Sequence, residues 1–530
     1  MQTDNSTAPN QSPPFANINL FTSDAALNDA VASAGLDAAA LGLSEFGRAW
    51  GAADSFDLGR LANENPPRLR SHDARGNRID VVEFHPSWHE LMRRSMAAGL
   101  HCSTWDGASQ TERAARVFMA YQTEAGHMCP ITMTHAAAAA LAREPALAKV
   151  WLPKIRSRTY DASFRPWWEK EGVTLGMGMT EKQGGTDVRA NTTQAVSRGD
   201  HYEITGHKWF MSAPMCDAFL VLAQAPGGLT CFLMPRFRPD GGVNALRFQR
   251  LKDKLGNRSN ASSEVEFEAA FAERVGAEGH GVRTIIEMVQ LTRVDCAVAS
   301  AGLMRFGLAY AAHHARHRMV FGKKLIDQPA MRAVLADLAL EVEASTALVF
   351  RLTRAMDAAA TNGAEAVYAR LMVPAIKYLV CKTAPAFLYE AMECLGGNGY
   401  VEELPLARAY REAPVNAIWE GSGNVMALDV LRAAGRTPAD ANGLINALEQ
   451  TAGVQAPELR AALTGNAPER HARLIVERLA RLGAVAALRE ANRDFADAYV
   501  ATRLAGPSHS TFGACDLTHV EDKLLARVQA

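Results

Sequence analysis

The sequence predicts a mainly helical protein that contains one β module. Short alternating stretches separated by Gly, Pro, Asp and Asn fill residues 176–275, a pattern typical of strands. Before and after them, apolar residues recur at spacings of three and four, which predicts helices. We therefore expect an extended arm over residues 1–20, an N-terminal helical domain over 21–175, a middle β domain over 176–280, a helical bundle over 281–437 and a C-terminal helical extension over 438–530.

The N-terminal part combines a polar arm with helices. Residues 1–20 are rich in Asn, Gln, Ser, Thr and Pro, which predicts a surface arm. Asn65-Pro66-Pro67 and His85-Pro86 are expected helix breaks. His89-Glu90 resembles the start of a zinc-binding HExxH motif, but Arg93 stands where the second His belongs. We therefore expect no metal site here.

Residues 176–193, GMGMTEKQGGTDVRANTT, form the candidate ligand-binding stretch. Met177 and Met179 alternate with glycines, as in a buried strand that passes close to another surface. Gly184 and Gly185 favour a sharp turn and a close approach of the backbone to a ligand. Threonine hydroxyls and free amides around such a turn suit a flat polar heterocycle or a pyrophosphate. Taken alone, the stretch is equally compatible with a glycine turn between two strands.

The helical pattern returns after Gly281. An apolar seam with one polar interruption runs from Leu335 to Met356 and predicts a helix of a bundle. Pro374 and Pro385 lie within the next helical pattern, and we expect them to kink or break it.

Composition excludes several classes of protein. With 56 basic and 57 acidic residues the net charge is −1, so nothing global favours a nucleic-acid or membrane partner. The eight cysteines form no CxxC pair, and without a secretory signal they predict reduced thiols and a cytoplasmic location. We find no apolar run of about 20 residues, so we expect no membrane span. The GxGxxG, Walker A and GxSxG motifs are also absent.

Several segments resemble the acyl-CoA dehydrogenases. MTEKQGGTDVRANTT is similar to their flavin-binding segment, and the resemblance is strongest to the bacterial adaptive-response (AidB-type) branch. It covers nearly the whole chain and fades after about residue 435. The other matching segments, in the same order as in that branch, are LGRLANENPP (58–67), EAGHMCPITMT (124–134), HKWFMSAP (207–214), LKDKLGNRSNASSEVEF (251–267), LGGNGY (395–400) and APVNAIWEGSGNVMALDVLR (413–432).

The resemblance implies a catalytic base at Glu420. In the family this position removes the α-proton of an acyl thioester while the β-hydride goes to flavin N5. Ile418 and Trp419 flank Glu420 on one side and small residues on the other, so partial desolvation would raise its pKa and make it a stronger base. Without the motif, a glutamate in a surface loop is the simpler interpretation. The alternative base position of some members corresponds to Thr292, which cannot serve.

The resemblance also implies FAD as the cofactor. In the family, Trp209 would pack on the flavin and Ser212 would reach its N5 edge, although Trp209 is equally compatible with an ordinary core aromatic. Arg318, which could also be a helix-end charge, would reach the FAD of a neighbouring subunit, so we expect a homo-oligomer, with a tetramer implied by the family. The expected FAD-binding residues are Met177, Met179, Thr180, Gly185, Thr186, Trp209, Ser212, Arg318, Phe321, Gly396, Gly397, Gly399, Trp419, Gly421, Ser422 and Asn424.

Two functions follow as expectations. The first is α,β-dehydrogenation of short or branched acyl thioesters. The alternative is a flavoprotein that binds double-stranded DNA through its C-terminal domain and protects it from alkylation with little turnover. Residues 438–530 hold ten basic and eleven acidic residues, which is unfavourable for phosphate binding. One face of a helix that continues past Gly483 would nevertheless gather arginines opposite Glu490, Asp494 and Asp497. The candidate DNA contacts are Arg470, Arg473, Arg478, Arg481 and Arg489.

Overall fold

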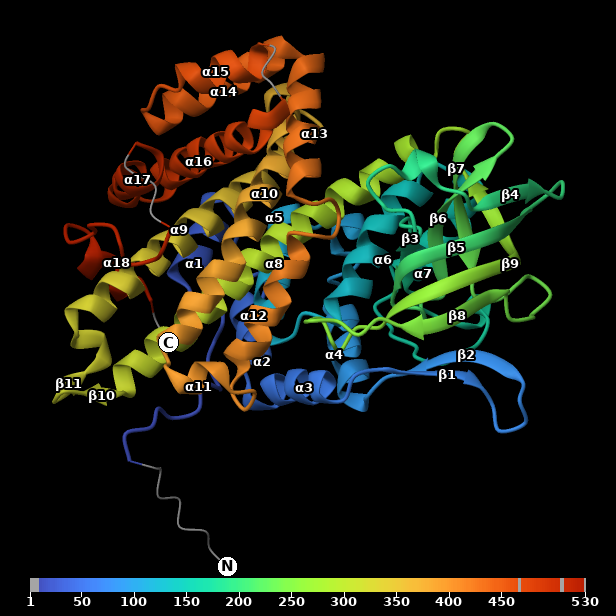
Figure 1. Ribbon diagram of the computed structural model, residues 1–530, viewed down its shortest axis with the longest axis horizontal. Helices are drawn as coiled ribbons and strands as arrows, with labels where there is room; N and C mark the ends of the chain where they lie inside the picture. The colour runs from blue at the N-terminus through green and yellow to red at the C-terminus, as the bar shows by residue number, and fades with distance from the viewer. Residues whose placement is uncertain (1–8, 466–468, 506–509, 529–530) are drawn as a thin grey trace, which may run out of the picture. The chain divides into compact units, whose positions relative to one another are not determined.

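The computed structural model describes residues 9–465, 469–505 and 510–528 (Figure 1). The first eight residues of the predicted arm therefore lie outside the described residues. The chain forms two compact units, described by themselves below. The sheet unit consists of residues 57–108 and 124–292, and the helical unit consists of residues 1–56, 109–123 and 293–530.

The sheet unit is built around a seven-stranded sheet. The strand order is β3-β6-β4-β5-β9-β7, and β8 pairs with β9. Because β7 also pairs with β6, the strands from β6 to β7 close into a ring. The strands are β3 (Leu175–Gly178), β4 (Gln194–Ser197), β5 (Tyr202–Ser212), β6 (Ala218–Ala225), β7 (Gly228–Pro235), β8 (Leu246–Leu251) and β9 (Ser262–Val275). The predicted β domain is confirmed.

Helices and a hairpin precede this sheet in the chain. The hairpin of β1 (Arg68–His72) and β2 (Arg78–Glu83) was not predicted. The break at Pro66 is confirmed, since α3 (Ala53–Glu64) ends just before it. No helix crosses His85-Pro86 either, because His85 is extended. This position is the start of α4 (Pro86–Ala97) and not a break within a helix, and the His85 ring accepts a hydrogen bond from the Ser87 amide. The remaining helices here are α6 (Met128–Leu141) and α7 (Pro145–Ile155).

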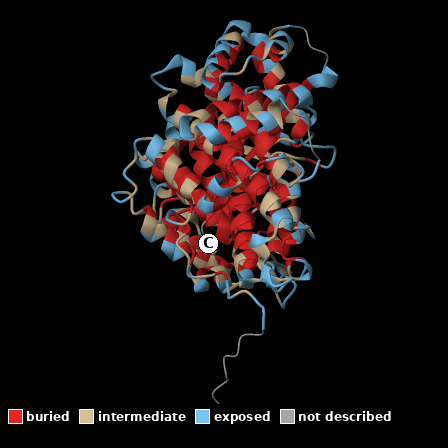
Figure 2. Cartoon of the chain, turned by 90° about the vertical axis from the view of Figure 1, so that its left-hand side faces the viewer, coloured by how far each residue is buried: buried red, intermediate tan, exposed pale blue. Residues whose placement is uncertain are grey.

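The helical unit is a bundle whose centre is apolar. Figure 2 shows the buried residues in red, between the helices in the interior of the bundle. The predicted seam lies on α9 (Pro329–Ala358), where Leu335, Leu338 and Val349 are buried. The other helices of the bundle are α1 (Ala25–Ser33), α2 (Leu43–Trp50), α5 (Gln110–Thr123), the later part of α8 (Gly281–His317), α10 (Gly363–Glu393), α11 (Gly397–Tyr400), α12 (Pro405–Asn416) and α13 (Gly423–Arg436). A short hairpin, β10 (Met319–Val320) with β11 (Lys323–Lys324), follows α8.

Helix α10 corrects one expectation. It continues through both Pro374 and Pro385, so of the expected kink or break the break is wrong. Its most apolar stretch is long enough and hydrophobic enough to cross a membrane, but 78% of that stretch is buried inside the protein. Helix α10 is therefore a core helix of the bundle.

The C-terminal extension packs on this bundle. Helix α16 (Ala472–Ala491) contacts both α9 and α10, as Figure 1 shows. It continues past Gly483, which was the condition for the predicted arginine face. A Cβ at this position would lie 2.5 Å from Cε of Met372, so glycine allows α16 to pack closely on α10. The other helices are α14 (Pro438–Ala452), α15 (Pro457–Thr464), α17 (Arg493–Tyr499) and α18 (Glu521–Arg527).

Candidate active site

The candidate flavin segment forms an exposed loop after β3, organised by the buried carboxylate of Glu181. Lys208 Nζ lies 2.8 Å from Glu181 Oε1, and both side chains are fully buried. The carboxylate also accepts from the Thr192 amide at 2.7 Å, the Thr193 amide at 3.2 Å and Gln183 Nε2 at 2.8 Å. Burial acts to raise the pKa of Glu181, but these donors outweigh it and hold the pKa well below the ordinary value. Sequence analysis missed this pair, although both members lie inside the matched segments.

The turn at the tip of this loop has the predicted form. The amide of Gly184 donates to the Glu181 carbonyl at 3.0 Å, and the Glu181 amide donates back to the Gly184 carbonyl at 3.3 Å. The φ of Gly184 is +134°, a conformation that favours glycine. Residues 182–187 are exposed, but the Lys182 amide donates to His207 Nε2 at 3.0 Å and the Gly184 amide closes the turn. The amides that this loop could offer a ligand are therefore those of Gln183, Gly185, Thr186 and Asp187.

The structure brings part of the predicted flavin set together. The Trp209 amide donates to the Thr180 carbonyl at 2.8 Å, which ties β5 to the loop. Trp209, Met179 and Thr180 are half-buried, and Ser212 Oγ lies 3.3 Å from Ser262 Oγ. Half-buried apolar groups beside exposed amides and hydroxyls fit a flat, polar cofactor such as FAD. Met177, Gly185 and Thr186 belong to the same strand and loop.

The sheet unit also contains a buried network that sequence analysis missed. Glu124 accepts from His127 Nδ1 at 2.8 Å, from Ser259 Oγ at 2.7 Å and from the Gly126 amide at 2.8 Å. On the other side of the ring, His127 Nε2 lies 2.9 Å from Ser95 Oγ. Burial acts to raise the pKa of Glu124, but the His127 and Ser259 hydrogen bonds outweigh it and hold the pKa below its ordinary value.

This network predicts a pH-dependent stability. A depressed carboxyl pKa stabilises the fold above the unfolded-state value of 4.5, and this contribution is lost as the pH falls below that value. Glu124→Gln should therefore lower the free energy of unfolding by about 1–3 kcal/mol at neutral pH. The difference in free energy of unfolding between the wild type and the variant should begin to narrow below about pH 4.5 and keep narrowing at lower pH in urea titrations. A difference that stays constant over this range would contradict the assignment.

In the helical unit, Glu420 lies in the connection between α12 and α13. It is half-buried, and its φ is +58°, followed by +104° at Gly421. A non-glycine residue in this region costs about 1–3 kcal/mol. Lys377 donates to the Trp419 and Gly421 carbonyls at 2.9 and 2.6 Å, and Arg293 Nε donates to the Glu420 carbonyl at 3.0 Å. Hydrogen bonds from charged groups contribute about 1.5–3 kcal/mol each, enough to offset that cost.

The residues that follow Glu420 begin α13. Ser422 occupies the N-cap position of this helix without a capping hydrogen bond from its side chain, and Asn424 lies in the first turn. Arg473 of the C-terminal extension donates to Asn424 Oδ1 at 2.7 Å. The extension therefore reaches a residue predicted to lie near the adenine half of FAD. Thr292, at the alternative base position, is buried and donates to the Val289 carbonyl at 2.9 Å.

The residues predicted to serve a neighbouring subunit are mostly exposed. Phe321 is 95% exposed and has a φ of +51°, and Tyr400 beside the glycine turn is 82% exposed. Arg318 Nη1 donates to the Asn10 carbonyl of the N-terminal arm at 2.7 Å. The glycine turn spans Gly396, Gly397 and Gly399 at the start of α11.

The arginines proposed for DNA are mostly engaged within the helical unit. Arg478 pairs with Glu458 at 2.7 Å, Arg481 with Glu477 at 2.9 Å and Arg489 with Asp497 at 2.5 Å. The placement of Asp494 and Asp497 opposite the arginines is wrong, because α16 ends at Ala491 and both aspartates belong to α17. Arg470 lies in the short η5 helix (Glu469–His471) before α16.

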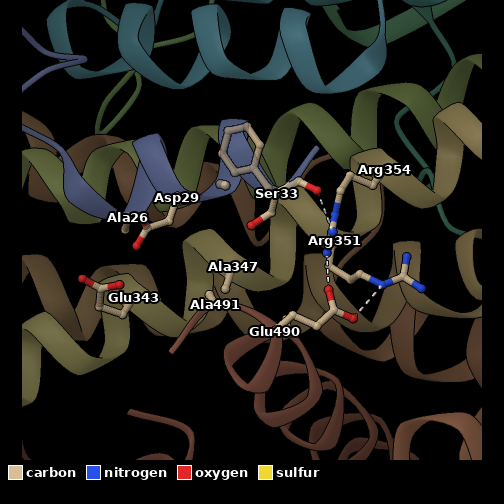
Figure 3. Close-up of a pocket in the computed structure, with 12 residues that line it drawn as sticks. Ala26, Asp29, Ser33, Glu343, Ala347, Arg351, Arg354, Glu490 and Ala491 are labelled. Carbon is tan, nitrogen blue, oxygen red and sulfur yellow. Dashed lines mark hydrogen bonds and ion pairs between the residues drawn. The ribbon is translucent and has the colours of Figure 1, made fainter. Parts of the chain in front are cut away.

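A pocket elsewhere in the helical unit is lined by charged residues (Figure 3). It lies among α1, α9 and α16, and Glu490 of α16 pairs with Arg354 there and approaches Arg351 Nε at 3.9 Å. None of the predicted FAD-binding or catalytic residues lines it.

Comparison with known proteins identifies the family. Residues 10–162 match the adaptive response protein AidB N-terminal domain, residues 176–270 the acyl-CoA dehydrogenase middle domain and residues 279–435 the acyl-CoA dehydrogenase C-terminal domain. The putative acyl-CoA dehydrogenase AidB of Escherichia coli K12 is 51% identical over 429 residues, covering 80% of this chain and 79% of that protein. The chain belongs to the acyl-CoA dehydrogenase family.

Solved structures of the family share the fold. Caenorhabditis elegans ACDH-11 in complex with C11-CoA is 28% identical with a TM-score of 0.81, covering 94% of this chain and 93% of that chain. A Bacillus anthracis acyl-CoA dehydrogenase complexed with FAD is 17% identical with a TM-score of 0.64, covering 84% of this chain and 79% of that chain. The predicted family, its adaptive-response branch and the fold class are confirmed.

Proposed function

We propose that the protein is an FAD-containing acyl-CoA dehydrogenase that introduces a double bond between Cα and Cβ of an acyl thioester. The observation that carries the proposal is the conformation of the Glu420 loop. Arg293 holds the carbonyl of the left-handed Glu420, and Lys377 holds the carbonyls on both sides of it. The backbone that carries the carboxylate is therefore fixed, which favours the positioning that general-base catalysis requires. The family membership supports the same reaction class.

In this proposal one set of residues binds FAD, and Glu420 transfers the proton. The remaining amides of the 182–187 loop, those of Gln183, Gly185, Thr186 and Asp187, suit the polar parts of FAD. Lys252 Nζ lies 3.4 Å from the centroid of the Trp209 ring, so Met179 and the face of Trp209 that Lys252 does not cover offer FAD apolar surface. Bound FAD supplies the hydride acceptor. Glu420 takes the α-proton, and the fixed loop keeps its carboxylate in place while that proton moves. Short or branched acyl groups are the proposed substrates.

We further propose that the protein works as a homo-oligomer, with a tetramer as the proposed state. Phe321 and Tyr400 support this, because both are large side chains that the single chain leaves exposed and that a subunit interface would bury. Sedimentation of the FAD-loaded protein tests the assembly.

Duplex DNA remains a weaker candidate partner. Four of the five arginines proposed for DNA, all but Arg470, contact groups of the same unit, which leaves less charge for phosphate binding. A salt-dependent retention of duplex DNA would restore this alternative.

Product analysis tests the proposed reaction. Incubation of the FAD-loaded protein with short straight and branched acyl-CoAs should yield enoyl-CoA products that have lost two hydrogen atoms, identified by mass spectrometry. Absence of any such product, with an artificial electron acceptor present, would overturn the proposal.

A further inference from the structure

Three consecutive carbonyl groups around Glu420 face cations from two helices. Lys377 on α10 holds the Trp419 and Gly421 carbonyls, and Arg293 on α8 holds the Glu420 carbonyl. The peptide groups before and after Glu420 are thereby fixed together. Because Lys377 reaches both flanking carbonyls with one ammonium group, it constrains the backbone on both sides of Glu420.

Lys377 is an unusual residue for this role. Its side chain is 1% exposed, among the most buried large side chains in the described part of the chain. Lysine is rarely buried without a structural or chemical reason, because burial of an ammonium group is costly. Its two hydrogen bonds in the structure go to backbone carbonyls of the loop, so its burial serves the loop conformation.

Lys377 is one of several charged groups around the Glu420 loop, and the others are already paired or lie beside Gly423. Arg293 is paired with Asp429 at 2.8 Å, and Asp429 is also held by Arg370 at 2.8 Å. Further along α8, Asp295 is paired with Arg113 at 2.7 Å. Tyr378 and Lys382 lie beside Gly423, where the same loop ends. The thiols of Cys296 and Cys381 are buried, and burial raises their pKa values, which keeps them neutral.

We propose that Lys377 is a positioning residue for the reaction. It fixes the left-handed backbone at Glu420 through the two flanking carbonyls, and its charge favours the ionised carboxylate. This inference rests on the proposed role of Glu420 as the base.

Substitution of Lys377 tests its proposed effect on the rate of FAD reduction and on the pH profile. Lys377→Met should slow the reduction of bound FAD by an acyl-CoA about 100-fold, within the range of positioning effects. The apparent pKa of the base in the pH profile should rise, because a nearby cation favours the carboxylate form. Lys377→Arg should recover part of the rate and return the pH profile toward the wild type. Lys523→Met is the matched control, because Lys523 is an exposed lysine paired with Asp494. It should leave the rate and the pH profile unchanged.

Hydrogen exchange tests positioning without turnover. In Lys377→Met, amides 418–424 should exchange faster while the rest of the helical unit keeps its wild-type protection. Unchanged exchange in this loop, or equal loss of protection throughout the unit, would overturn the proposal, as would a wild-type pH profile in Lys377→Met. If Lys377→Met does not fold, Lys377→Gln, which keeps a neutral donor, replaces it in the same comparison. A wild-type protein that no thioester reduces would refute the proposed function, whereas the exchange data would still decide whether Lys377 fixes the loop.

Discussion

Glu420→Gln should slow the reduction of bound FAD by an acyl thioester about 10³- to 10⁴-fold. The amide has nearly the shape of the carboxylate but cannot accept the α-proton, so the variant removes the base and little else. The left-handed backbone at this residue should persist, because its carbonyl contacts do not involve the carboxylate. Anaerobic stopped-flow absorbance of the oxidised flavin band measures the rate directly.

Two controls make this result specific. FAD content and the melting temperature of Glu420→Gln should match the wild type, which shows that the fold and cofactor site are intact. Glu171→Gln, on an exposed glutamate outside the proposed site, should reduce FAD at the wild-type rate. Reduction of Glu420→Gln at the wild-type rate would mean that another group takes the proton.

Lys208→Met should destabilise the sheet unit by about 3–5 kcal/mol, because it leaves the Glu181 carboxylate buried without its ammonium partner. The same change should weaken FAD retention, since Glu181 holds the amides that shape the 181–193 loop. Urea denaturation with a probe in the sheet unit measures the loss, because a chain with two units need not unfold in one step.

A double variant and an exposed pair test the origin of this effect. Glu181→Gln combined with Lys208→Met should recover part of the lost stability, because the unpaired buried charge is then gone. Arg247→Met, which breaks the exposed Arg247–Glu268 pair at 2.8 Å, should cost less than about 1 kcal/mol. Equal losses of unfolding free energy in Lys208→Met and Arg247→Met would show that burial of the Glu181–Lys208 pair does not increase its contribution to stability.

Local patterns in the sequence predicted the larger features. The change from helical to alternating spacing identified the sheet from β3 to β9, and the seam on α9 identified the bundle. The β1–β2 hairpin was missed because its strands are short and largely polar. The break in α10 was wrong because tertiary packing keeps the helix continuous through Pro374 and Pro385.

Contacts between distant positions could not be predicted in the same way. Glu181 and Lys208 are 27 residues apart, and Lys377 meets the Gly421 carbonyl 44 residues away. Such pairs depend on how strands and helices pack, which no local pattern specifies. The misplacement of Asp497 had a local cause, because Asn492 accepts from the Phe495 amide, starts a new helix and turns α17 back toward Arg489.

The most direct test of the proposed function is the anaerobic absorption spectrum of the purified protein, recorded with and without a panel of short straight and branched acyl-CoAs. We expect an oxidised flavin spectrum that at least one thioester bleaches within a single turnover. A spectrum that no thioester bleaches would contradict the dehydrogenase activity, and a colourless protein that cannot be reconstituted with FAD would contradict the flavin site at residues 176–193.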